Sequence, residues 1–185
     1  IPGLKVVVPS NPDDAKGLLI SAIRDNNPVL FFEHMELYSM KAEVREETYE
    51  YPLGEARILR EGTDLTVVAI SMMVKKVLDA SKILIPDKID LEVIDPRSLS
   101  PMDYETIIKS VKKTGKLLIV DESPPRCSIS VDIAANVAEL AFDNLHAPIS
   151  RITCPHSPVP LSPPLEAAYI PSVKNIVSAA KKLCS

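Results

Sequence analysis

Hydrophobic and polar positions along this chain alternate between two periods, and the alternation predicts strands and helices in turn. Short runs rich in β-branched residues, such as Leu65 to Ile70 and Leu117 to Val120, predict buried strands. The stretches between them carry apolar residues at helical spacing, as Ile107 and Val111 do. This order indicates βαβ units and an α/β fold, in which helices cover a parallel sheet on both faces.

The predicted elements follow from local signals at their ends. The apolar runs predict strands at residues 5–8, 29–32, 56–59, 65–70, 91–94, 117–120 and 149–153. Capping residues predict that helices start at Ser10 or Asn11 (with Pro12 in the first position), at Ser71, at Ser100-Pro101, at Ser128 or Ser130, and at Ser172. Gly115 stands where a left-handed helix cap is expected.

Two segments lack this periodicity. Residues 34–52 are strongly charged, and we expect them to form a solvated linker. The stretch from Pro148 to Pro171 holds seven of the 17 prolines. We expect the part between the last strand and the last helix to be extended and to lie on a protein surface, either that of this chain or that of a partner.

Composition excludes several classes of protein. The chain has 185 residues, with 21 Lys and Arg interspersed among 25 Asp and Glu, which argues against a nucleic-acid-binding surface. The longest mostly apolar run, Leu65 to Val74, is too short to span a membrane. The 5 glycines form neither of the familiar phosphate-binding loops, so we expect no phosphate grip in this chain. Three cysteines without paired spacing indicate a reducing, cytoplasmic compartment.

Side chains that follow the predicted strands are the candidates for chemistry, because open α/β sheets bind ligands at the carboxyl ends of their strands. These are Asp95-Pro96-Arg97 and the run Asp121 to Ser128, which includes Glu122, Arg126 and Cys127. We expect Cys127 to be a small packed residue, and Arg97 and Arg126 to make ion pairs between domains. The three histidines are too scattered to assign to a catalytic thiol, and no catalytic residue is proposed.

Two further segments carry possible ligands. Cys154-Pro155-His156 offers only two donors and is not taken as a metal site. The corner Asp25-Asn26-Asn27-Pro28 follows a predicted helix end, where carbonyl oxygens lack partners and would suit a hard cation. From the residues alone, this corner is more simply a helix stop.

Several motifs in order along the chain resemble one family. They are Gly3 to Pro12, Ala15 to Leu19, Ser21 to Val29, Pro52-Leu53-Gly54, Arg60 to Asp64, Glu92 to Arg97, Ser162 to Glu166 and Pro171-Ser172. Together they resemble the β subunit of the thiamine-diphosphate-dependent first component of 2-oxo acid dehydrogenase complexes. The departures at Asp121 to Ser128 and Pro155 to Pro160 resemble the acetoin dehydrogenase branch.

The resemblance implies a domain organisation. Residues 1–45 would be the C-terminal remnant of the pyrimidine-binding domain, whose last βαβ unit they form, and residues 46–185 a transketolase-like C-terminal domain. The chain begins Ile1-Pro2-Gly3 without an initiator Met, and we expect that a further segment precedes it. The family's catalytic Glu and His would lie in that segment, so no catalytic or cofactor-binding residue is carried over.

The resemblance also implies cofactors and partners. The pyrophosphate of thiamine diphosphate and its magnesium would be held by an α subunit, within an α2β2 heterotetramer that includes a β–β contact. A lipoyl acyltransferase would accept the product. A structural potassium ion would be bound at Ala22, Ile23, Asp25 and Asn27, mostly through backbone oxygens.

We therefore expect a β subunit that helps to cleave acetoin, or to decarboxylate a 2-oxo acid. This part would serve assembly and docking and would be inactive alone. The alternatives are a pyruvate or branched-chain enzyme, a non-catalytic binding module, and a free-standing nucleotide-binding domain. The missing Gly-rich turn disfavours the last of these.

Overall fold

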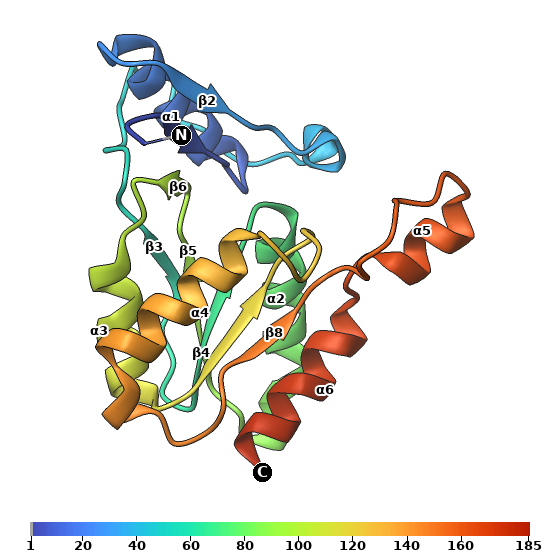
Figure 1. Cartoon of the computed structure of the whole chain (residues 1–185). Helices are drawn as coiled ribbons and strands as arrows, with labels where there is room; N and C mark the ends of the chain where they lie inside the picture. Colours follow the sequence, from blue (N-terminus) through green and yellow to red (C-terminus); the bar gives the residue numbers. More distant parts are fainter. Residues whose placement is uncertain (1) are drawn as a thin grey trace.

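A computed structural model of the chain describes residues 2–185, and within them it contains two β-sheets (Figure 1). The larger sheet has the strand order β3-β5-β4-β7-β8, and the smaller has the order β2-β1-β6. The small sheet and its helix lie at one end of the larger unit (Figure 1). The α/β fold class expected from the periodicity is confirmed.

The larger sheet is mostly parallel. Its strands are β3 (Arg57–Arg60), β4 (Leu65–Ala69), β5 (Leu91–Asp95), β7 (Leu117–Val120) and β8 (Ser150–Ile152). Strands β5, β4, β7 and β8 run parallel, whereas β3 pairs antiparallel with β5 at one edge. All residues of β4, β5 and β7 are buried, because helices cover both faces of the sheet.

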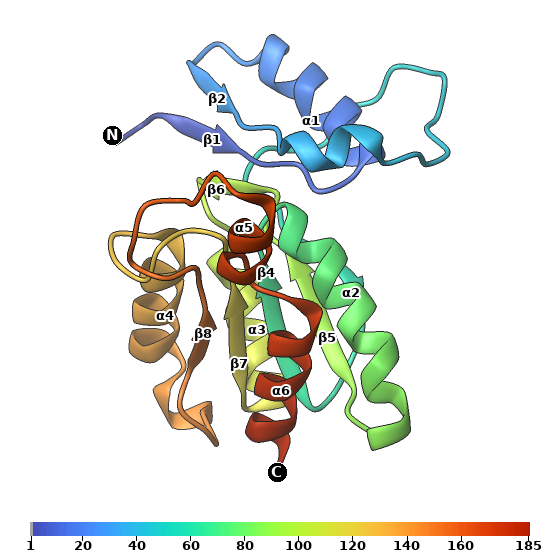
Figure 2. The ribbon, with the colours of Figure 1, turned by 90° about the vertical axis from the view of Figure 1, so that its right-hand side faces the viewer.

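Each face of the large sheet packs against two long helices. Helices α2 (Met72–Leu84) and α6 (Val173–Cys184) cover one face, and α3 (Tyr104–Thr114) and α4 (Ile129–Leu140) cover the other. In Figure 2, α6 lies in front of the strands and α3 behind them. Side chains alternate along β4, so Val67 packs toward α2 and α6, and Val68 toward α3 and α4. Short 3-10 helices, η2 (Ile85–Asp87) and η3 (Phe142–Asn144), follow α2 and α4.

The small sheet is built around a βαβ unit. Strands β1 (Lys5–Val7) and β2 (Val29–Phe31) are parallel and are joined by α1 (Pro12–Arg24). Asn11 caps α1 by accepting from the Asp14 amide at 2.9 Å, and Pro12 occupies the first turn, as expected. The third strand, β6 (Ser98–Ser100), pairs antiparallel with β1 although it comes from the second half of the chain. This pairing ties the small sheet to the large unit.

The predicted helix start at Ser100-Pro101 was wrong. Residues 98–100 form β6, and α3 begins at Tyr104 with Asp103 as its cap. The Asp103 carboxylate accepts from the Thr106 amide at 3.0 Å, and the pairing of β6 with β1 removes Ser98–Ser100 from the helix. The end of α3 agrees with expectation, since Gly115 has a φ of 72° and its amide donates to the Val111 carbonyl.

The segment 34–52 is mostly exposed, as its charges predicted, but it is more structured than a linker. It contains a 3-10 helix, η1 (Met35–Ser39), and a strap that crosses α1. Tyr49 and Tyr51 donate hydrogen bonds from their hydroxyls to the Asp13 carboxylate at 2.9 and 2.6 Å. The two tyrosines pack on α1, and the Arg45 guanidinium lies 3.8 Å from the centre of the Tyr49 ring, contacts that the charge pattern did not indicate.

The proline-dense stretch also holds a helix that the sequence analysis did not predict. Between β8 and α6, residues Pro163–Tyr169 form α5 on an arm that projects from the body (Figure 1). Pro163 and Pro164 favour the first turn, where no amide partner is needed, and the Glu166 amide donates to the Ser162 carbonyl. The rest of the stretch is irregular.

Gly62 lies in the turn between β3 and β4, where the chain passes close to the start of β5. A Cβ at this position would lie 2.2 Å from the Leu91 carbonyl carbon, which is backbone and cannot move aside. The turn therefore requires glycine for its close approach to β5 rather than for its φ angle.

We predict that Gly62→Ala destabilises the protein by about 1–3 kcal/mol, because the added methyl group overpacks the turn. The neighbouring Thr63→Ala, at an exposed position, is the control and should change stability by less than about 0.5 kcal/mol. Urea unfolding followed by circular dichroism measures both. Equal stabilities of the two variants would contradict the close packing.

Candidate functional site

The carboxyl ends of β5 and β7 both meet the small βαβ unit, and the residues just beyond them form the contact. Asp95 ends β5, and its carboxylate accepts a hydrogen bond from the Ser10 hydroxyl before α1. Glu122 follows β7, and it contacts His34 beyond β2. The residues that the sequence pattern placed at the strand ends thus lie between the two units.

His34 and Glu122 pair across this contact. His34 Nε2 lies 2.8 Å from Glu122 Oε2, and each side chain is about a quarter exposed (25% and 23%). His34 Nδ1 accepts from the Glu36 amide at 3.3 Å, which leaves Nε2–H to donate to the carboxylate. In the described chain, Asp121 Oδ2 and Glu122 Oε1 are buried without a hydrogen-bond partner. No local pattern of residues indicates this pair, since 88 residues separate its members.

We predict that His34→Ala destabilises the protein by about 1–3 kcal/mol, because Glu122 loses the donor to its half-buried carboxylate. His156→Ala is the matched control, since His156 is exposed, and it should leave the unfolding midpoint in urea within error of wild type. If both histidine variants behave alike, the pair does not hold the units together.

Cys127 is not packed, contrary to the sequence-based expectation. It is exposed, with a φ of 52°, in the loop before α4. Cys154, in contrast, is buried, and burial raises the pKa of its thiol to about 11, with Glu122 and Asp121 adding to the effect. A neutral, buried thiol is a poor nucleophile. Neither cysteine forms a thiol–imidazole pair with a histidine in the described residues.

Arg97 makes the ion pair between units that the sequence predicted. The Arg97 Nη1 atom lies 3.2 Å from Asp14 Oδ1 on α1, and the two side chains are 6% and 0% exposed. Arg57 approaches the same oxygen at 3.4 Å. For Arg126, which is exposed, residues 2–185 contain no ion-pair partner, so this half of the prediction is not supported.

The corner predicted to bind potassium is formed at the end of α1. The Lys5 ammonium bonds to the Asp25 carboxylate, and the Asn27 amide and side chain donate to the same carboxylate at 2.8 and 3.0 Å. These bonds, of which the one from Lys5 has the largest effect, lower the pKa of Asp25 to about 2. The Asp25 side chain is therefore neutralised from within the chain.

The backbone oxygens of this corner remain available. Among the described residues, no hydrogen bond ends on the carbonyl of Ala22 or Ile23, as is usual at a helix C-terminus. Carbonyl oxygens at an electronegative helix end are hard ligands of the kind that alkali cations accept. No group of three His, Cys, Asp or Glu side chains suited to a metal ion occurs in residues 2–185. The donor set fits a weakly bound monovalent cation held by carbonyls.

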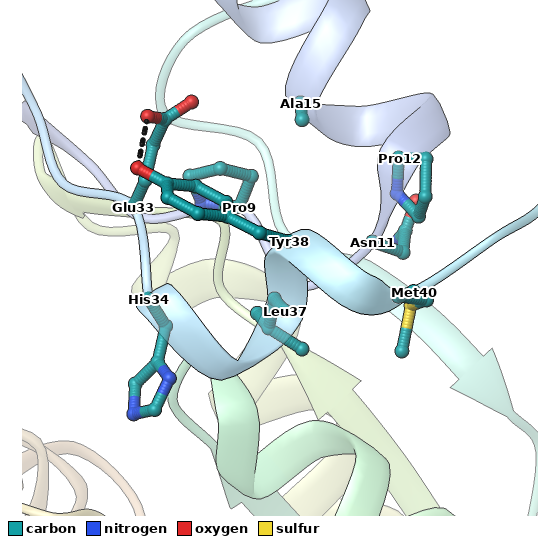
Figure 3. A pocket seen from close by; sticks show the side chains of 9 residues that line it. All are labelled: Pro9, Asn11, Pro12, Ala15, Glu33, His34, Leu37, Tyr38 and Met40. Atoms are coloured by element: carbon teal, nitrogen blue, oxygen red, sulfur yellow. Dashed lines mark hydrogen bonds between the residues drawn. The ribbon is translucent and has the colours of Figure 1, made fainter.

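A pocket of about 270 Å³ opens beside the N-terminus of α1 (Figure 3). It is lined by Pro9, Asn11, Pro12, Ala15, Glu33, His34, Leu37, Tyr38 and Met40. Its one carboxylate, Glu33, accepts from the Tyr38 hydroxyl at 3.0 Å, and the His34 ring points away from Tyr38 (Figure 3). The lining is mainly apolar, and its polar side chains are engaged: Tyr38 bonds to Glu33 within the pocket, and His34 pairs with Glu122 outside it.

Family comparisons agree with this architecture. Residues 54–176 match the model of the transketolase C-terminal domain, and residues 1–41 match the transketolase pyrimidine-binding domain. The chain therefore belongs to the transketolase C-terminal domain family. A solved split-gene transketolase, described as an inactive β4 tetramer, superposes with a TM-score of 0.79 at 25% identity over 100% of this chain and 58% of its own.

The curated relatives narrow the family further. The β subunit of acetoin:2,6-dichlorophenolindophenol oxidoreductase from Bacillus subtilis is 56% identical over 99% of this chain, and that from Cupriavidus necator is 52% identical over 98%. The pyruvate dehydrogenase E1 β subunit of B. subtilis is 45% identical over 98%. These matches cover 54%, 54% and 56% of the relatives, so the chain spans about half of their length. The resemblance stated from the motifs is confirmed.

Proposed function

We propose that this chain is part of the β subunit of a thiamine-diphosphate-dependent dehydrogenase that acts on acetoin. The observation that carries the proposal is the identity to the two acetoin oxidoreductase β subunits, 56% and 52%, against 45% to the pyruvate dehydrogenase subunit. Cleavage of acetoin and transfer of the fragment to a lipoyl group would be the activity of the whole assembly. A pyruvate or branched-chain 2-oxo acid is the alternative substrate.

Within that assembly, the proposed role of this chain is to bind other subunits. Large apolar side chains are exposed at β2, at η1 and on the α5 arm, among them Phe32 (56%), Met35 (80%) and Leu161 (99%). Exposed apolar surface of this kind favours contact with another protein. The proposed partners are an α subunit, a second β subunit and a lipoyl acyltransferase. The division of the chain into two domains between residues 45 and 46 is part of the same proposal.

The cofactor would be held mainly outside this chain. Thiamine diphosphate carries a pyrophosphate with magnesium, and residues 2–185 provide no cluster of three acidic or histidine ligands. The sequence has no Gly-rich phosphate loop either. The described residues therefore do not fit the pyrophosphate, and we assign it to the α subunit. A cytoplasmic location is also proposed, from the three free cysteines; no described helix is long and apolar enough to cross a membrane.

We predict that co-expression of the full-length β-subunit gene, of which this chain is a part, with the gene of its α subunit gives thiamine-dependent reduction of a dye by acetoin, with slower turnover of pyruvate. The chain of residues 1–185 alone should show neither turnover nor thiamine diphosphate binding by calorimetry, and it is the control. An assembly that turns over neither substrate would contradict the proposal. Tight cofactor binding by the isolated chain would contradict the assignment of the pyrophosphate to the α subunit.

We also propose that the corner of Ala22, Ile23, Asp25 and Asn27 binds potassium. The free carbonyls of Ala22 and Ile23 support this proposal, and the Lys5–Asp25 pair argues that the ion is held by backbone oxygens rather than by the carboxylate.

We predict that the thermal unfolding midpoint is higher in potassium chloride than in sodium chloride at equal ionic strength. Asp25→Ala should reduce the difference, because the carboxylate fixes the corner by accepting from both nitrogens of Asn27. Arg24→Ala, an exposed neighbour, is the control and should retain it. Equal midpoints of the wild-type protein in the two salts would show that the corner is only a helix stop.

A further inference from the structure

Asp95 is a carboxylic acid buried between the two units of the chain. It ends β5 of the large sheet, has 0% exposure, and accepts from the Ser10 hydroxyl of the small unit. We propose that Asp95 makes the contact between the two units pH-dependent, with its carboxyl group neutral while the units are docked and charged when they separate. This inference is independent of the proposed function.

Few donors stabilise a negative charge at this position. Besides Ser10, the Asp95 carboxylate accepts only from the Arg97 amide, at 2.9 Å. The Arg97 guanidinium, which would be the natural counter-ion, instead binds Asp14 Oδ1 and the Glu55 carbonyl. The Asp95 carboxylate therefore accepts hydrogen bonds from one hydroxyl and one amide, but it has no direct cationic partner among the described residues.

Of the surrounding charges, that of Asp14 adds to this effect and that of Arg97 opposes it. Asp14, which is fully buried on α1, repels a negative charge on Asp95, and the Arg57 and Arg97 guanidinium groups are both drawn to Asp14. The Tyr51 ring of the strap lies 5.2 Å from the Arg97 guanidinium. Asp103 lies before α3; burial acts to raise its pKa, but local hydrogen bonds, and after them the Arg97 charge, lower it overall. The buried junction thus contains two carboxylates, and both arginines pair with Asp14 rather than with Asp95.

Burial, aided by the charge of Asp14, raises the pKa of Asp95 to about 7, against the opposing effects of the Ser10 hydroxyl and of the amide and positive charge of Arg97. In a separated or unfolded chain the group would ionise near its ordinary value of 3.8. Protons are therefore bound more tightly in the docked state. The contribution of Asp95 to the stability of the docked state is therefore complete below about pH 4 and is lost as the pH rises through about 7.

Hydrogen exchange of the full chain tests the proposal, with protection compared between α1 and β4 from pH 5 to pH 8 after correction for intrinsic rates. In the wild-type protein, protection of α1 relative to β4 should fall by at least about tenfold over this range. In Asp95→Asn, which cannot ionise, the ratio should stay constant. Asp79→Asn, an exposed carboxylate on α2, is the matched control and should behave as wild type.

A second variant keeps the test decisive if Asp95→Asn does not fold. Ser10→Ala removes a donor that favours the charged form, so its loss of protection should occur at a higher pH than in the wild-type protein. A pH-independent ratio of protection in wild type would overturn the proposal. An equal fall in wild type and Asp95→Asn, or an unshifted fall in Ser10→Ala, would also overturn it, because another group would then be responsible.

Discussion

Arg97 and Asp14 form a buried ion pair at 3.2 Å, and the placement of the small βαβ unit on the large sheet depends on it. Both side chains are nearly inaccessible to water, so removing either one would leave a buried charge without its partner. Such a pair adds little net stability but disfavours other arrangements of the two units. The neighbouring pairing of β6 with β1 fixes the same contact through the backbone.

The large sheet provides the rigid base for this contact. Because both faces of β4, β5 and β7 are covered by helices, the carboxyl ends of β5 and β7 are held in fixed positions. Asp95 and Glu122 stand at those ends and meet Ser10 and His34 of the small unit. Residues that would line a ligand site in many α/β proteins here serve to join two units.

A second feature of the chain is the apolar surface that it exposes. Apolar side chains are exposed on β2, η1 and the α5 arm. Arm residues such as Leu161 and Leu165 gain nothing from exposure to water, and α5 buries none of its residues against the body. Burying such side chains stabilises contact with another protein through the hydrophobic effect.

The sequence by itself determined the strands of the large sheet and, apart from the start of α3, the four helices that cover it, because buried parallel strands and amphipathic helices leave strong periodic signals. It also placed Arg97 between the units and led to the family through ordered motifs. Only the tertiary structure decided what non-local contacts control: β6 pairs with a strand more than 90 residues away, Tyr49 and Tyr51 pack on α1, and Cys127 is exposed. The pairing of His34 with Glu122 and the burial of Asp95 likewise depend on how two units meet, which no local pattern of residues encodes.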